Sequence, residues 1–232
     1  MPTQTMRQVR SRRAMLAAGG SGLIALTLAA CASLPPLSLD EAVRRLLRRS
    51  ADRALTRLTA PGGGWDGFIA RADLPGSLGA QGGALARLLT SPQVRVRLRE
   101  SLRPAAERAV RRAAPVLADA VRQVGIANAR AILRGGPHAA TAYLRGEMRG
   151  SLVQAMLPEF ADLLHGLDDP LLGSALSILA GVDVSGWVRE LAARADDVLW
   201  DALADAEAEI RADPRATGDA MLVAALALAA TN

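Results

Sequence analysis

The chain has 232 residues, of which 50% are hydrophobic and 3% aromatic, enough for one domain with a real core. Arginine supplies every basic side chain, because the sequence contains no lysine. The formal charge is +5, but four of the 28 arginines and none of the acids precede residue 31. The remainder therefore carries 24 arginines against 23 acids. Such a balance gives no general attraction to nucleic acid, which we exclude as a partner.

Residues 1–30 have the composition of a signal peptide, with a basic start and an apolar run from Ala14 to Ala30. Leu28-Ala29-Ala30-Cys31 resembles the bacterial lipobox, in which the cysteine is acylated and becomes the new N-terminus after cleavage. Cys31 is the only cysteine, so it has no disulfide partner. We expect a lipidated tether over 31–37, a helical domain over 38–230, and attachment to a membrane through Cys31. A transmembrane or buried N-terminal helix is the alternative, although glycines interrupt the short apolar run.

The export route is left open by the basic start. Ser11-Arg12-Arg13-Ala14-Met15-Leu16 resembles a twin-arginine signal, with Met15 where that pattern prefers Phe, but adjacent arginines also occur in ordinary signal peptides. Ala32 follows the cysteine in place of an aspartate. By resemblance to Gram-negative lipoprotein sorting, this favours the outer membrane, with the domain facing the periplasm.

The first predicted helix of the domain begins after Ser38, which can cap it with Glu41 three residues on, and it continues to about Thr59. The glycine-rich stretch 60–64 breaks this helix. A loop to about Gly79 then holds Trp65 and Phe68, which either pin the loop to the core or belong to a ligand lid.

Ser91-Pro92 predicts the start of another helix, with a capping serine and a first-position proline. The sequence from Val94 to Leu98 alternates like a strand, but no partner strand is evident, so we expect helix. This region is locally basic, either as a solvated helix face or as a contact for anionic lipid headgroups. Its basic residues are Arg95, Arg97, Arg99, Arg103, Arg108, Arg111 and Arg112.

A helical corner is predicted in the middle of the chain. Ile126, Ala129 and Ile132 recur at helical spacing, and Gly135-Gly136 follows as a helix stop, because glycine can enter the left-handed conformation without a Cβ penalty. Pro137 suits the first position of a second helix, whose spacing continues to Pro158. His138, Thr141, Tyr143 and Arg145 form the candidate polar corner at this junction.

Three further elements are predicted beyond the corner. A turn at 167–170 leads into a small apolar helix over 171–180, and the longest helix, capped by Asp183 or Ser185, runs to about Ala212. A last helix begins at Asp213-Pro214 and ends near Ala230. Its apolar residues Leu222, Val223, Leu226 and Leu228 are expected to dock on the domain.

No residue pattern predicts catalysis, a metal or a cofactor. The two histidines, His138 and His165, have no zinc-ligand spacing, and no nucleophile elbow or phosphate loop is present. Asp197, Asp201 and Asp205 form an acidic row that we interpret as a solvated helix face. Gly135-Gly136 could expose N–H groups to an anion, but Pro137 removes one donor, so a helix stop is the preferred interpretation.

Three segments together resemble the bacterial family catalogued as domain of unknown function 4197. They are Ala105–Val110 with Asp119–Val121, Ala129–Gly136 with Ala139–Arg145, and Glu207–Ala216, which in order and spacing cover most of 37–226. The resemblance implies an all-α fold, export and frequent lipid anchoring, with no established activity. The chain departs from the family pattern at His138, where an acid is usual, and at Met148, where Thr is usual.

The sequence predicts an all-α domain that acts as a non-enzymatic envelope interaction or binding module, with an anionic envelope lipid or an envelope protein as partner. A carrier of an apolar or lipid ligand between helices is the alternative. A hydrolase using Asp168, Asp169 or His138 is the third hypothesis.

Overall fold

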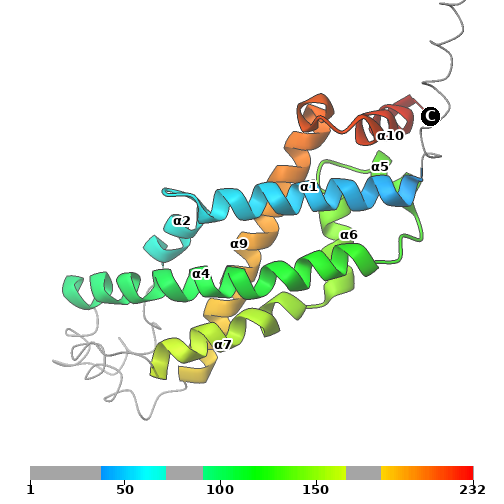
Figure 1. The fold of residues 1–232 in the computed structure, drawn as a ribbon. Helices are drawn as coiled ribbons and strands as arrows, with labels where there is room; N and C mark the ends of the chain where they lie inside the picture. Colours follow the sequence, from blue (N-terminus) through cyan, green and yellow to red (C-terminus); the bar gives the residue numbers. More distant parts are fainter. Residues whose placement is uncertain (1–37, 72–90, 166–183, 232) are drawn as a thin grey trace, which may run out of the picture. The chain divides into compact units, whose positions relative to one another are not determined.

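The computed structural model describes residues 38–71, 91–165 and 184–231, and every regular element in these ranges is a helix. This confirms the all-α prediction for the described part of the chain (Figure 1). The elements are α1 (Leu39–Thr59), α2 (Gly64–Arg71), α4 (Pro92–Gln123), α5 (Ala129–Arg134), α6 (Ala139–Met148), α7 (Ser151–His165), α9 (Val184–Ala212), the 3₁₀ helix η3 (Pro214–Thr217) and α10 (Ala220–Thr231).

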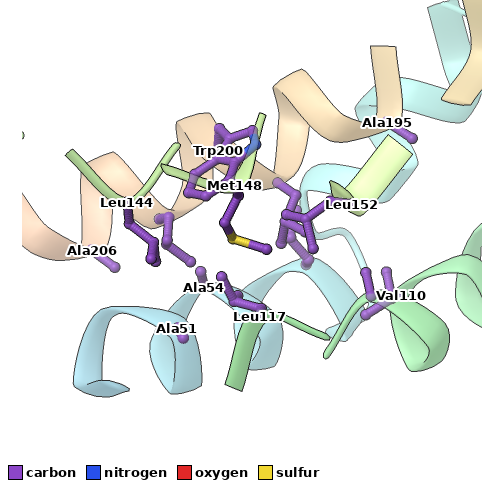
Figure 2. Close-up of a cluster of buried hydrophobic side chains, with 14 of the residues drawn as sticks. Ala51, Ala54, Val110, Leu117, Leu144, Met148, Leu152, Ala195, Trp200 and Ala206 are labelled. Carbon is purple, nitrogen blue, oxygen red and sulfur yellow. The ribbon is translucent and has the colours of Figure 1, made fainter. Parts of the chain in front are cut away.

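The longer helices pack around one apolar core. Helix α4 lies against α7 and α1, and α9 crosses them and contacts both α1 and α7 (Figure 1). Leu144, Met148 and Leu152 meet Leu117 of α4 and Trp200 of α9 at the centre of this packing (Figure 2). The helices can approach closely because small residues, including Ala54, Ala109, Ala195 and Ala206, are fully buried between them.

Helices α1 and α4 begin at their predicted serine caps, whereas Ser185, one of the two caps predicted for the longest helix, lies inside α9. The Ser38 hydroxyl accepts a hydrogen bond from the Glu41 N–H at 3.3 Å, and α1 ends at Thr59. The Ser91 hydroxyl accepts from the Val94 N–H at 3.4 Å, and the region with strand-like alternation is helical. None of the helices in the described ranges is long and apolar enough to cross a membrane.

The prediction of a loop around Trp65 and Phe68 is wrong. Both residues lie on α2, are about 95% buried, and their rings meet edge to face with centroids 5.3 Å apart. Helix α1 ends at Thr59 with Ala60 as its C-cap, and α2 begins at Gly64 and carries the aromatic pair into the core. Both rings pin this segment to the core, which is one of the two predicted alternatives.

The single helix predicted between Pro137 and Pro158 is also wrong. Arg149 and Gly150 have φ values of 43° and 82°, so the chain leaves α6 in a left-handed turn and restarts as α7. Pro158 lies inside α7 and does not end it. Gly150, which adopts this turn without strain, is the signal that the interpretation of the sequence missed.

The predicted last helix is split in two. The Asp213 carboxylate caps η3, and Gly218, with φ of 66°, separates η3 from α10. Leu222 is fully buried, Val223 and Leu226 are partly buried, and Leu228 is 49% exposed, so the prediction that Leu228 docks is wrong. The turn and small helix predicted over 167–180 lie outside the described residues, as does Asp183.

A buried carboxylate joins α4 to α7. Glu159 is 5% exposed and accepts hydrogen bonds from Nε of Arg108 at 2.8 Å and Nε of Arg112 at 2.7 Å. The Arg108 bond lowers the pKa of Glu159 from its ordinary value; burial acts in the opposite direction, and Arg112 adds to the lowering. Two members of the locally basic region are therefore occupied within the fold.

Replacing Glu159 by Gln should lower the free energy of unfolding by about 1 to 3 kcal/mol at neutral pH, because two charge-assisted hydrogen bonds are weakened. A carboxylate whose pKa is lowered by folding stabilises above its unfolded pKa, and this contribution disappears as the pH falls through the folded pKa. The difference from the parent chain should therefore shrink below about pH 4.5 in urea titrations. Glu100→Gln is the matched control, since Glu100 pairs with Arg97 on an exposed face. An equal loss at neutral and acid pH would contradict the assignment.

Candidate functional site

The predicted polar corner lies where the turn 135–138 connects α5 to α6. Helix α5 has six residues and α6 has ten, so neither is long enough to be stable by itself. Helix α9 contacts α6 and supplies the polar groups that hold the corner. The geometry of the corner is therefore set by residues more than sixty positions later in the sequence.

Glu207 of α9 holds the start of α6. Its side chain is fully buried, and its carboxylate accepts hydrogen bonds from the Ala140 N–H at 2.9 Å and the Thr141 N–H at 2.7 Å. A carboxylate at a helix N-terminus satisfies free N–H groups and lies at the positive end of the helix dipole. The chain thus provides its own anion at the place where Gly135-Gly136 had raised the possibility of an anion ligand.

Arg211, one turn further along α9, holds the end of α5. Its Nε donates to Glu207 at 2.7 Å, Nη1 donates to the Leu133 carbonyl at 2.8 Å, and Nη2 donates to the Ile132 carbonyl at 3.0 Å. These carbonyls belong to the last turn of α5, where the Ile132 carbonyl also accepts from the Gly135 N–H at 3.2 Å. We call the pair Glu207 and Arg211 the corner clamp, because it binds the end of one helix and the start of the next.

The four candidate polar residues reach different partners. His138 places Nδ1 3.0 Å from the Ala204 carbonyl, which can only accept, so Nδ1 carries the proton. The Tyr143 hydroxyl donates to the Gly125 carbonyl, and Arg145 pairs with Asp197. The Thr141 hydroxyl is buried and has no hydrogen-bond partner within the described ranges. These side chains position helices and do not converge on a common point.

Arg145 also faces a buried acid. Asp196 is 7% exposed, accepts from Nε1 of Trp200 at 3.0 Å, and lies 3.7 Å from Arg145 Nη2. Burial raises the pKa of Asp196, while Arg145 and Trp200 act against that rise. The Arg145 guanidinium lies 5.9 Å from the centroid of the Trp200 ring. The group connects α6 to α9.

The helix stop predicted at Gly135-Gly136 is confirmed, but the predicted left-handed conformation is wrong. Helix α5 ends at Arg134 and Gly135 is its C-cap, but Gly135 has an extended conformation, with φ −60° and ψ 175°. A Cβ on Gly135 would lie 2.5 Å from the Cβ of Ala139, so glycine is needed there for close approach. The prediction that Pro137 is the first residue of the next helix is wrong, because α6 begins at Ala139 with His138 as its N-cap.

None of the four candidate residues lines any of three surface pockets found among the described residues. A pocket of about 420 Å³ lies between α2 and α9, lined by Phe68, Arg71, Leu191, Arg194, Asp197 and Val198. A groove of about 310 Å³ lies between α4 and α6, with Val116, Ala120, Val124, Leu144 and Met148 among its lining residues. A pocket of about 130 Å³ lies between α1, α5 and α10, lined by Leu39, Arg130, Leu133, Arg134, Leu228 and Ala229.

Other predicted groups show no metal or catalytic arrangement within the described residues. Asp197, Asp201 and Asp205 are exposed on α9, and no group of His, Cys, Asp and Glu in the described ranges could hold a metal ion. Cys31, Asp168 and Asp169 lie outside those ranges, and the side chain of His165 is not described.

Glu207 and Arg211 were missed as structural determinants by the interpretation of the sequence. Their four-residue spacing is the available signal, but it is also typical of an ordinary surface ion pair on a helix. What distinguishes them is burial, at 0% exposure for Glu207 and 11% for the Arg211 side chain. That burial depends on α5 and α6 packing over them, which local spacing does not reveal.

The fold and the corner clamp define a helical protein whose polar groups mainly join its helices to one another. The chain belongs to the family described as protein of unknown function (DUF4197), whose model matches residues 33–226. This confirms the family resemblance drawn from the sequence. No curated protein and no solved structure matches the chain.

Replacing Glu207 by Gln should lower the free energy of unfolding by about 3 kcal/mol, because it leaves the largely buried Arg211 without its charge partner. Urea denaturation followed by circular dichroism measures the loss. Glu209→Gln is the matched control, since Glu209 is two residues away on the same helix, half exposed, and paired with Arg57. That control should change stability by less than about 1 kcal/mol. Equal effects of the two variants would contradict the corner clamp.

The two corner glycines should differ sharply on substitution. Gly135→Ala should cost about 1 to 3 kcal/mol, because its Cβ would overlap that of Ala139. Gly136→Ala should be neutral or slightly stabilising, because a Cβ there meets nothing within 4 Å and the unfolded chain loses freedom. Thermal unfolding of the two variants side by side measures the difference. Similar losses in both would show that close approach is not the reason for glycine at 135.

Proposed function

We propose that this chain is a lipid-anchored helical module at the periplasmic face of a Gram-negative outer membrane, which acts by binding an envelope partner and catalyses no reaction. The observation that carries the proposal is Leu28-Ala29-Ala30-Cys31, with the only cysteine of the chain at the acylated position of a lipobox. Ala32 after that cysteine supports retention in the outer membrane. The basic, apolar start of the chain supports export.

The use of the polar side chains supports a binding module over an enzyme. His138, Tyr143 and Arg145 are engaged with groups of the chain itself, and the N–H groups that start α6 are engaged with Glu207. An active site needs a nucleophile or base directed at a place where substrate can lie. At the polar corner these groups instead hold α5, α6 and α9 together.

A carrier of an apolar or lipid ligand is the second candidate, and the groove between α4 and α6 is the observation that favours it. Its lining is mainly apolar and includes Val116, Leu144 and Met148. The groove is open at the surface, so a ligand would lie along the helices and not inside the core, which is filled by Leu152, Met156 and Phe160.

Changing Cys31 to Ser should abolish acylation and release the chain from membranes. The measurement is metabolic labelling with a palmitate analogue together with membrane fractionation, since only the cysteine sulfur accepts the diacylglyceryl group. Changing Ala32 to Asp is the companion variant: it should keep the label and move the protein to the inner membrane. Unchanged membrane attachment of the Cys31 variant would overturn the anchoring proposal.

The intact mass of the purified mature chain distinguishes the two candidates in the same preparation. Excess mass that survives denaturation reports the covalent acyl groups. Further excess that is present only under native conditions reports a noncovalent ligand and favours the carrier. Acyl mass alone supports the binding module.

A further inference from the structure

Helix α10 is apolar around its whole circumference, yet its last turns are partly exposed. Its sequence, AMLVAALALAAT, contains no charged residue. Helices of this kind are normally buried, because they have no polar face to turn toward water. In this chain only Leu222 and Ala225 of α10 are buried, whereas Ala227, Leu228 and Ala230 are exposed. The outer side of α10 is therefore an apolar surface without a cover among the described residues.

Two arginines border this apolar surface. Arg130 and Arg134 lie one turn apart on α5, are both exposed, and line the small pocket that Leu228 and Ala229 of α10 also line. Neither arginine makes an ion pair or hydrogen bond with the described part of the chain, in contrast to Arg108, Arg112 and Arg211. Helix α5 contains no acid. We call Arg130, Arg134 and the exposed residues of α10 the α5–α10 face.

The chain enters the helical body beside this face. Leu39, the first residue of α1, lines the same pocket, and α10 and α5 both contact α1 (Figure 1). Leu39 follows Cys31 by only eight residues, which span at most about 30 Å when fully extended. An acyl anchor at Cys31 would hold the α5–α10 face within that distance of the bilayer, where weak contacts act at high effective concentration.

The other basic region is placed less favourably for this contact. The first part of α4 lies near α2, at the opposite end of α1 from Leu39, and Arg103 there pairs with Asp66 of α2 (Figure 1). Helix α1 has 21 residues and so extends about 30 Å away from the point where the chain enters. Of the two acids in the first turn of α1, Glu41 is paired with Arg45, so Asp40 is the one that opposes an anionic surface there.

We infer that the α5–α10 face docks on the anionic phospholipid surface of the membrane that holds the Cys31 anchor. Leu228 and its exposed neighbours enter the interface between headgroups and acyl chains, while Arg130 and Arg134 bind headgroup phosphates. The inference rests on the proposed function, because the acyl anchor brings the face to the bilayer. The corner clamp contributes indirectly, since Arg211 holds the turn of α5 that lies beside Arg134.

The test uses the mature lipidated chain with a fluorescent label at residue 228. Acylation blocks the Cys31 sulfur, so the Leu228→Cys thiol is the one that reacts. The variant is reconstituted in vesicles of neutral phosphatidylcholine, and in vesicles containing about one third phosphatidylglycerol. Val96→Cys is the matched control, because Val96 is 51% exposed against 49% for Leu228 and lies on the first turns of α4.

Aqueous acrylamide should quench the fluorescence of the label at residue 228 about threefold less in the anionic vesicles than in the neutral ones. In high salt, quenching in the anionic vesicles should rise to the level seen in the neutral ones. Quenching at residue 96 should be the same in both vesicles. Adding Arg130→Gln and Arg134→Gln should remove the protection at residue 228. Each arginine is expected to contribute roughly fivefold in apparent affinity near an anionic surface.

Three results would overturn the inference: equal quenching at residue 228 in both vesicles, protection unaffected by the arginine substitutions, or protection that depends on protein concentration and not on lipid charge. The last would assign the face to a second copy of the chain. Failure of the proposed function has a different signature, because a chain without acyl groups lacks the acyl mass and reacts with the label at Cys31 as well.

Discussion

The arrangement of the helices depends on the ion pair between Glu207 and Arg211. Removing two charges from water costs several kcal/mol per ion, and mutual attraction offsets this only when their remaining hydrogen-bonding capacity is also used. Here Glu207 accepts two N–H groups of α6, and Arg211 donates to two carbonyls of α5. Two helices too short to persist alone are thereby fixed on α9. Since α10 packs on α5, the position of the C-terminal helix depends on the same pair.

Much of the fold could be predicted because its signals are local. A capping serine starts α1 and α4, and apolar periodicity carries α1 to Thr59 and α9 to Ala212. The errors occur where tertiary contacts override local preference. Trp65 and Phe68 form a helix after a glycine run because their rings enter the core, and Arg149 accepts a left-handed conformation beside Gly150. Leu228 followed the apolar pattern of its helix but is 49% exposed, so no part of the described chain covers it fully.

The candidate site was less predictable, because its partners are distant in the sequence. His138, Thr141 and Arg145 share helical spacing, which is a reason to expect a common polar site. In the structure His138 meets Ala204 and Arg145 meets Asp196 and Asp197, all on α9. The group that organises the corner, Glu207, is 67 residues from Ala140. Spacing on one helix identifies which residues share a face, but it does not identify what packs over that face.

Net charge is a poor guide to the surface of this chain, because some of its arginines pair with buried carboxylates while others are exposed at the surface. Each of the four buried carboxylates in the described residues is paired with arginine: Glu159 with Arg108 and Arg112, Asp196 with Arg145, Glu207 with Arg211, and Asp219 with Arg45. The pKa of Asp219 is lowered overall: burial by itself would raise it, but hydrogen bonds from the Leu222 N–H and from Arg45 outweigh that effect. Arginine suits these positions, since the N–H groups of its planar guanidinium can donate to a carboxylate and to backbone carbonyls at the same time. The balance of 24 arginines and 23 acids therefore includes charges already neutralised within the fold, while Arg130 and Arg134 leave the surface beside α10 locally positive.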